Sequence, residues 1–233
     1  IARENQISFK YESSTEDSDN IMSMLMERVF DVYDDARGNS GDYLLWNYEG
    51  IHINTLYQEV NGKYKYTYNV VVSYYTNYEQ EQYVEARVNE ILNELDLENK
   101  SEYKKIKLIY DYICSNVSYD YENLNNKDYK LQYTAYAALH DNTAVCQGYA
   151  NLFYYMCKEA GLSVRIIGGY GNGEPHGWNI VRIGGVYYNV DSTWDAGNPI
   201  SYTYFLKNQA EFIDHSRDQE YTTNDFYQLY PMA

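Results

Sequence analysis

The stretch VCQGYANLFYYMCKEAGL, residues 145–162, decides the fold. Its apolar residues recur at steps of three and four residues, which is the spacing of a helix with one buried face. Gly161 follows the last apolar position, and glycine commonly ends a helix there. The pattern therefore predicts a helix from Val145 to Ala160, with Cys146 in its first turn.

Cys146 is the first candidate functional residue. The opening amide groups of a helix have no intrahelical partner, and the helix dipole is positive at that end. Such positions lower thiol pKa values from about 8.5 into roughly the 3.5–7.5 range, and the thiolate is the strong nucleophile. We expect Asp141, Asn142 or Thr143 to cap this helix. A cysteine that only packs at a helix start is the alternative on this evidence.

A second stretch, HGWNIVRIGGVYYNVDSTWD at residues 176–195, predicts a β-hairpin with the glycine pair 184–185 as its turn. The register of this turn makes His176 and Asp191 diagonal neighbours on one face, with Cα atoms about 7–8 Å apart. A carboxylate that binds one imidazole nitrogen orients the ring and leaves the other nitrogen for a thiol. The spacing predicts that the histidine and the carboxylate act together with the thiol of the preceding helix.

These two stretches, with YTAYAAL at 133–139, resemble the transglutaminase-like superfamily in its secreted bacterial branch. The resemblance covers about residues 101–200 well and extends more loosely to 1–100. It implies an α+β fold: a papain-like or transglutaminase-like core whose nucleophile helix packs on an antiparallel sheet. It also implies Cys146 as nucleophile, His176 as general base and then acid, and Asp191 as the orienting carboxylate. Gly177 stands where the family often has Ala.

The chain divides into two predicted parts. Residues 1–98 form a small N-terminal α/β lobe, and residues 99–233 form the catalytic core with a C-terminal extension. Periodicity predicts helices over 20–36, 79–97, 101–117 and 133–139, and strands over 51–57, 64–75, 163–169, 176–183 and 186–193. Ser101 is the expected cap of the helix that follows it.

The implied reaction is a two-step acyl transfer through a thioester, in which the backbone N–H of Cys146 binds the oxyanion. The second oxyanion donor is expected to be a side chain, with Tyr136 as the candidate and Tyr133 or His140 as alternates. Gln147, Trp178 and Trp194 are expected to line the cleft, and for Trp194 a packing role is equally open.

The expected function is thiol-dependent acyl transfer on peptide or protein amides. A cysteine peptidase, a deamidase and a transglutaminase share the same three residues, and peptide hydrolysis makes the simplest demand because water is its acceptor. The alternative is a catalytically silent cell-surface module that binds a partner through an acidic, tyrosine-rich surface.

Composition limits the partners. The chain has 18 Lys and Arg against 34 Asp and Glu, a net charge of −16, which argues against nucleic acid and permits cationic substrates. No apolar run is long enough to span a membrane. The chain begins at Ile1 without Met and without an apolar leader, so we expect a trimmed or mature fragment. The resemblance to the secreted branch implies an extracellular or cell-surface location. The expected partner is a peptide or protein substrate, associated with a cell wall or surface.

The remaining cysteines and histidines receive no functional role. Three cysteines without a CxxC pair exclude a disulfide framework and a four-cysteine zinc site, so no metal and no cofactor is expected. Cys114 is expected to be buried, and Cys157 lies about three helical turns beyond Cys146. His52 and His215 show no companion residues in the sequence and are expected at the surface.

Overall fold

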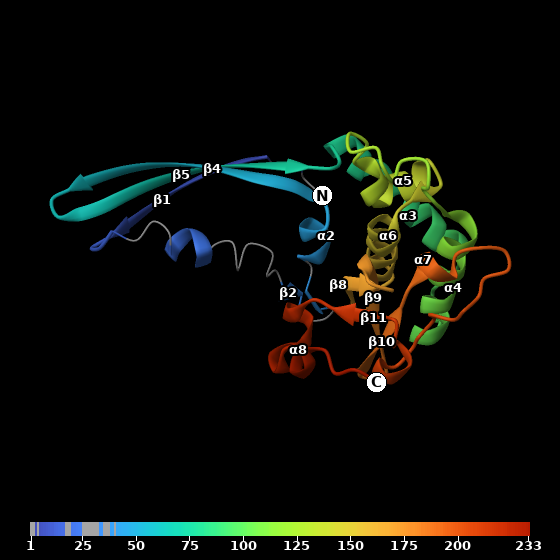
Figure 1. The fold of residues 1–233 in the computed structure, drawn as a ribbon. Helices are drawn as coiled ribbons and strands as arrows, with labels where there is room; N and C mark the ends of the chain where they lie inside the picture. Colours follow the sequence, from blue (N-terminus) through green and yellow to red (C-terminus); the bar gives the residue numbers. More distant parts are fainter. Residues whose placement is uncertain (1–2, 4, 17–19, 25–32, 35–37, 40) are drawn as a thin grey trace.

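The structure is a computed structural model that describes residues 3, 5–16, 20–24, 33–34, 38–39 and 41–233. A three-stranded ribbon projects from a body in which helices pack on a second sheet (Figure 1). This mixture of helices with antiparallel sheets confirms the α+β class predicted from the sequence.

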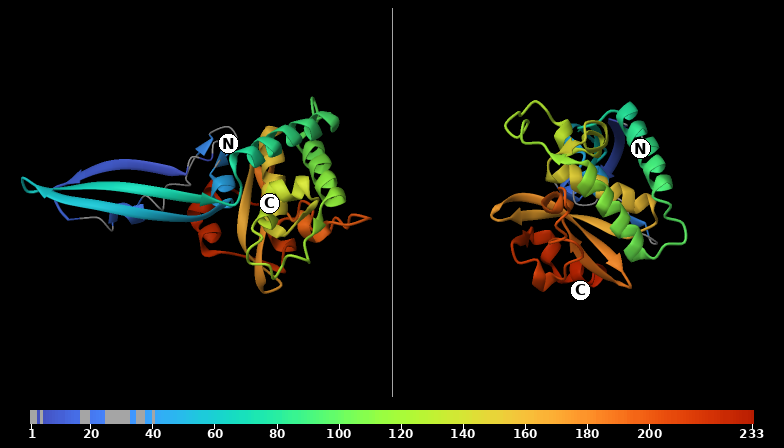
Figure 2. Two further views of the ribbon diagram at one scale, coloured as in Figure 1. Left: turned by 90° about the horizontal axis from the view of Figure 1, so that it is seen from above. Right: turned by 90° about the vertical axis from the view of Figure 1, so that its right-hand side faces the viewer.

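The projecting ribbon consists of β1 (Gln6–Ser13), β5 (Lys63–Tyr74) and β4 (Tyr48–Val60), antiparallel and in that order. The views in Figure 2 show it extending well beyond the body. A two-residue turn, Asn61 and Gly62, joins β4 to β5. Both residues have positive φ, as a tight hairpin turn of this kind requires. Alternate residues of β5 face one side, where Tyr66 and Tyr68 are buried. The expected strands 51–57 and 64–75 are thus confirmed, whereas β1 was not predicted.

The helix expected over 20–36 is described only in part. Residues 20–24 are helical, and β2 (Tyr33–Asp34) pairs with β3 (Gly38–Asn39). Residues 25–32 and 35–36 lie outside the described residues. α2 (Asp42–Leu45) follows β3.

The sheet of the body has the antiparallel order β10-β9-β8-β11, built from β8 (Val164–Gly171), β9 (Glu174–Ile183), β10 (Val186–Val190) and β11 (His215–Arg217). β9 and β10 pair in the register that the glycine turn predicts, beginning with Val186 opposite Ile183. The pairing ends at Val190, so the strand expected to reach residue 193 is shorter. The cause is that Asp191 caps α7 (Ser192–Asp195).

The helix α6 (Cys146–Glu159) lies between this sheet and the other helices, and ten of its residues are buried. Around it lie α3 (Tyr78–Glu94), α4 (Glu102–Asn116) and α5 (Ala135–His140). Ser101 caps α4 as expected, since its side chain accepts a hydrogen bond from the Lys104 amide at 3.3 Å. The buried face of α3 belongs to the same hydrophobic core as α4 and α6, so this helix packs with the body although the sequence places it in the N-terminal lobe. The boundary at residue 98 stays a prediction.

Short elements complete the fold. They are β6 (Ser118–Tyr119), η1 (Leu131–Tyr133), β7 (Thr143–Ala144), η2 (Gln209–Glu211), η3 (Gln219–Thr222) and α8 (Asn224–Leu229). Across the described part of the chain, no helix combines the length and the apolar character that crossing a membrane requires.

Candidate active site

Cys146 is the first residue of α6, as the sequence predicts, but no side chain caps the helix. The N-cap is Val145, in extended conformation and without a side-chain hydrogen bond, so the expected caps Asp141, Asn142 and Thr143 are wrong. Backbone contacts fix the helix start instead, because the Val145 amide donates to the Gln132 carbonyl at 3.0 Å. The thiol therefore stands at the open, positive end of a helix whose position is set by main-chain packing.

Gly148 allows this close packing. A Cβ at Gly148 would lie 2.7 Å from the Cβ of Ala144 and 2.8 Å from the carbonyl oxygen of Gln132. Only a residue without a side chain lets the first turn of α6 approach β7 and η1 so closely.

His176 and Asp191 meet as the hairpin register predicts. His176 lies on β9, and its Nε2 is 2.7 Å from Oδ2 of Asp191. The other carboxylate oxygen accepts hydrogen bonds from the amides of Thr193 and Trp194 at 2.9 and 3.3 Å. The carboxylate is thus held on both oxygens, and the ring of His176 is left with Nδ1 free for another partner.

Burial and hydrogen bonding set the charges of this pair. Burial lowers the pKa of His176, but hydrogen bonds with Asp191 and then Cys146 outweigh it and raise the pKa from 6.5 to about 10. Burial raises the pKa of Asp191, but hydrogen bonds from His176 and His215 outweigh it and lower the pKa from 3.8 to about 2. At neutral pH the His176 ring is therefore the protonated imidazolium, with a proton on both nitrogens, and the Asp191 carboxyl group is ionised.

Cys146 and His176 face the same small cavity of about 280 Å³. We call it the thiol cavity, and Trp46, Tyr133, Gln147 and Asp218 also line it. The thiol, the imidazole and the carboxylate are therefore adjacent in space, although they come from α6, β9 and the end of β10.

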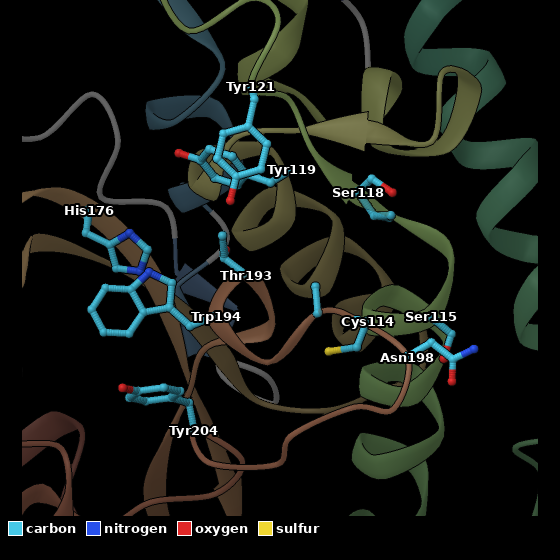
Figure 3. Close-up of a pocket in the computed structure, with 13 residues that line it drawn as sticks. Cys114, Ser115, Ser118, Tyr119, Tyr121, His176, Thr193, Trp194, Asn198 and Tyr204 are labelled. Carbon is cyan, nitrogen blue, oxygen red and sulfur yellow. The ribbon is translucent and has the colours of Figure 1, made fainter.

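A larger cavity of about 720 Å³ also has His176 in its lining (Figure 3). We call it the tyrosine cavity, because Tyr119, Tyr121 and Tyr204 line it together with Trp194 and Cys114. The indole of Trp194 stacks on the His176 ring at 5.0 Å between centroids. His176 thus has access to two cavities.

The predicted cleft residues divide into two groups. Gln147 lines the thiol cavity and Trp194 the tyrosine cavity, as expected. Trp178 is only 1% exposed and donates its Nε1–H to Asn189 at 3.2 Å, so it is a core residue and its expected place in the cleft is wrong.

The oxyanion candidates also need correction. Tyr136 packs on His140 at 5.0 Å between ring centroids and on Tyr83 at 5.4 Å, away from the residues that line either cavity. Of the two alternates, Tyr133 lines the thiol cavity. Sequence reasoning missed Tyr119. It stands opposite Ala144, two residues before Cys146, and lines the tyrosine cavity with His176. Burial, and after it the charge of Cys146, raises the pKa of Tyr119 to about 12.

His215 is not a surface residue, which corrects the expectation from the sequence. Its side chain is 0% exposed, and its Nε2 lies 3.2 Å from Oδ2 of Asp191. The residue reaches this place because β11 pairs with β8, where His215 stands opposite Gly171. In the sequence, the adjacent Asp214 is the one hint of a role for His215. It does not predict the contact of His215 with Asp191, which lies 24 residues earlier. His52, by contrast, is exposed as expected.

The other sulfur atoms are buried. Cys114 donates to the carbonyl of Ser192 at 3.4 Å, and Cys157 is 0% exposed. Burial raises the pKa of both thiols. The expected burial of Cys114 is confirmed, and Cys146 is the partly exposed thiol of the three.

One group among the described residues has metal-ligand character. The donor atoms of His176, Asp191 and His215 all lie within 4.8 Å of one another. Hydrogen bonds at 2.7 and 3.2 Å already join these atoms, so shared protons account for the arrangement. The expectation that the site uses no metal stays a prediction.

Comparison with known proteins identifies the domain. The model of the transglutaminase-like superfamily core matches residues 89–192, which include Cys146, His176 and Asp191. Kyphoscoliosis peptidase from Mus musculus is 31% identical over 147 residues, covering 57% of this chain and 22% of that protein. The Homo sapiens protein of the same name is 29% identical over 143 residues, with 55% and 22% covered.

The chain thus spans about a fifth of the length of these relatives. A crystal structure of a TGase superposes with a TM-score of 0.45 and 16% identity, covering 80% of this chain and 51% of that one. The superfamily match encloses the three residues whose geometry is described above, and this chain therefore carries a transglutaminase-like domain over residues 89–192.

Proposed function

We propose that this protein catalyses thiol-dependent acyl transfer on peptide or protein amides, with Cys146, His176 and Asp191 as its catalytic residues. One observation supports the proposal above all. The thiol of Cys146, at the start of α6, faces the same cavity as the imidazole of His176. The Nε2 atom of that imidazole lies 2.7 Å from the buried carboxylate of Asp191. Nucleophile, acid–base group and orienting group are then in the order that a two-step acyl transfer needs.

The first step forms a thioester. The sulfur of Cys146 attacks the amide carbonyl carbon, and the electrons of the C=O bond move onto its oxygen. When the tetrahedral intermediate collapses, the C–N bond breaks and His176 gives its proton to the leaving amine. In the second step His176 takes a proton from water, and the water oxygen attacks the thioester carbonyl carbon. The C–S bond then breaks, which releases the carboxylic acid and leaves Cys146 as a thiolate beside protonated His176.

The oxyanion needs two donors. The backbone N–H of Cys146 is one, because amides at a helix start have no intrahelical partner. For the second donor we propose Tyr119 in place of Tyr136. Tyr119 stands opposite Ala144 in the pairing of β6 with β7, two residues before Cys146, and its side chain lines a cavity together with His176. Tyr119→Phe should lower kcat by about tenfold or more with little change in KM.

Peptide hydrolysis is the version we favour, with water as the acyl acceptor. The name of the two relatives, kyphoscoliosis peptidase, supports this choice. Location outside the cell, or at its surface, remains part of the proposal and is tested by fractionation of the native host.

The test is mass spectrometry of a peptide library incubated with the protein, with and without an added primary amine. Hydrolysis yields cleaved peptides, deamidation adds about one mass unit to glutamine peptides, and cross-linking yields amine adducts that appear only with the amine. Cys146→Ala should abolish every product, whereas the matched control Cys157→Ala, which removes a buried thiol that lines neither cavity, should retain them.

Thiol alkylation separates an enzyme from a silent binding module. Iodoacetamide should modify Cys146 first, and His176→Ala should slow that reaction because the thiol loses its imidazole partner. No product from the library, together with an alkylation rate unaffected by His176→Ala, would leave only the binding module.

A further inference from the structure

The carboxylate of Asp191 serves two imidazole rings. Its Oδ2 lies 2.7 Å from Nε2 of His176 and 3.2 Å from Nε2 of His215. Asp191 is 1% exposed, so water does not compete for this oxygen. The acid–base residue of the proposed reaction therefore shares its orienting group with a second histidine, which the mechanism above does not use.

His215 is held on its other nitrogen as well. Its Nδ1 lies 2.8 Å from Oδ1 of Asp214, and Asp214 accepts a further hydrogen bond from the Tyr204 hydroxyl at 2.6 Å. An ionised carboxylate only accepts hydrogen bonds, so His215 satisfies both partners when both of its nitrogens carry a proton. The titratable groups that surround it are Asp191, Asp214, His176 and Tyr204.

Aromatic rings enclose His215 completely. The ring of Phe212 stacks on it at 3.9 Å between centroids, Trp194 lies at 4.4 Å and Trp178 at 5.0 Å. For packing alone, a phenylalanine would suit such surroundings better than a polar ring, because a buried polar group without a partner is costly. The two carboxylate contacts are what distinguish a histidine here.

We propose that His215 is a positioning residue of the thiol site, which fixes the Asp191 carboxylate so that Asp191 in turn fixes the His176 ring. The inference rests on the proposed thiol chemistry, since it concerns how the acid–base group is oriented. Asp214 is the anchor of this arrangement, because it holds the far nitrogen of His215 and is itself bound by the Tyr204 hydroxyl.

Three substitutions separate positioning from packing. His215→Phe keeps a ring in the aromatic enclosure and removes both hydrogen bonds. His215→Gln packs less well but retains an amide donor for Asp191. Asp214→Asn keeps an acceptor for the ring and removes the anchoring charge. Thermal melts of the three variants report the packing, and kcat, KM and the alkylation rate of Cys146 report the site.

The two roles predict opposite orders. If His215 positions Asp191, His215→Phe lowers kcat by about tenfold with KM unchanged, His215→Gln recovers most of that loss despite a lower melting temperature, and Asp214→Asn lies between them. If His215 only packs, kcat follows the melting temperature, so His215→Gln is the worst variant and His215→Phe is close to wild type. That second order would overturn the proposal.

Alkylation keeps the test independent of the amide reaction. If wild-type protein cleaves no amide, the proposed function fails, but the rate at which iodoacetamide modifies Cys146 still ranks the three variants. The same order, Gln faster than Phe, would support positioning without turnover. Equal rates for both His215 variants and wild type would overturn it.

Discussion

The thiol cavity and the tyrosine cavity share His176 and differ in almost everything else. The thiol cavity is about 280 Å³ and includes the carboxylate of Asp218 beside the indole of Trp46. The tyrosine cavity is about 720 Å³, and the described residues that line it include no Asp, Glu, Lys or Arg. An amide held at Cys146 would thus have a narrow, acidic environment on one side and a wide, neutral, aromatic one on the other.

The difference indicates where discrimination between substrates arises. A carboxylate beside an aromatic face favours a cationic group, since both attract positive charge. A wide neutral cavity with tyrosine hydroxyls accepts many uncharged groups. We therefore expect changes in the thiol cavity to alter rate and selectivity strongly. In the tyrosine cavity we expect weak effects from every lining residue except His176 and the proposed oxyanion donor Tyr119.

The largest effect is expected from filling the thiol cavity. A Cβ at Gly168 would lie 3.1 Å from both the Asp218 carboxylate and the Trp46 ring. Gly168→Val should therefore exclude substrate and lower kcat/KM by about a hundredfold, because small misplacements at a reacting centre cost that much. Gly50→Val, at a glycine with nothing within 4 Å of its Cβ position, is the matched control. Equal activity of the two variants would show that substrate does not enter this cavity.

The pH dependence tests the group that the two cavities share. The pKa of His176 is raised to about 10, so the ring is protonated below that pH and loses its proton above it. Above pH 10 amide cleavage should fall about tenfold per pH unit, because the leaving amine loses its acid. Alkylation of Cys146 needs no such acid and should continue. Parallel loss of both reactions above pH 10, in protein that is still folded by circular dichroism, would contradict this assignment.

A smaller effect is expected from the charge at Asp218. Asp218→Asn should reduce the preference for peptides with a basic side chain next to the cleaved bond by about two- to fivefold, since exposed ion pairs contribute about 0.2–1 kcal/mol. Cleavage of neutral peptides should not change. Raising the salt concentration should reduce the preference of the wild type in the same direction. A preference that survives both changes would place the selectivity elsewhere.

The smallest effect is expected in the tyrosine cavity. Tyr121 is 75% exposed at its rim, so Tyr121→Ala should change kcat/KM by about twofold at most. The measurement is the same peptide series, compared with Tyr170→Ala, an exposed tyrosine of β8 that lies outside both linings. A tenfold loss for Tyr121→Ala alone would reverse the ranking of the two cavities.

The part of the site carried by local patterns was predictable. The helix that begins at Cys146 follows from apolar spacing, and the meeting of His176 with Asp191 follows from a two-residue glycine turn that fixes the register. Both depend on residues close together in the chain. The same holds for Ser101, whose side chain caps the helix that directly follows it.

The part carried by distant contacts was not predictable. His215 reaches Asp191 through the pairing of β11 with β8. Trp46 lines the thiol cavity from the short segment between α2 and β4, about a hundred residues before Cys146 in the chain. Tyr136 failed as an oxyanion candidate because its short helix turns it toward His140. The spacing of apolar residues along the chain does not predict such contacts, because they depend on how separate elements pack together.

The buried pair of Asp42 and Arg165 affects how the chain can be divided. Both carboxylate oxygens of Asp42 bind the guanidinium, at 2.6 and 2.9 Å, and Oδ2 also accepts from the amide of Ile166. A fragment that starts at residue 99 would leave Arg165 as a buried cation without its counter-ion, a defect that typically costs 3–5 kcal/mol. It would also lack Trp46, one wall of the thiol cavity. Residues before 99 thus contribute to the core and to the thiol cavity, and tests of the proposed activity need the longer polypeptide.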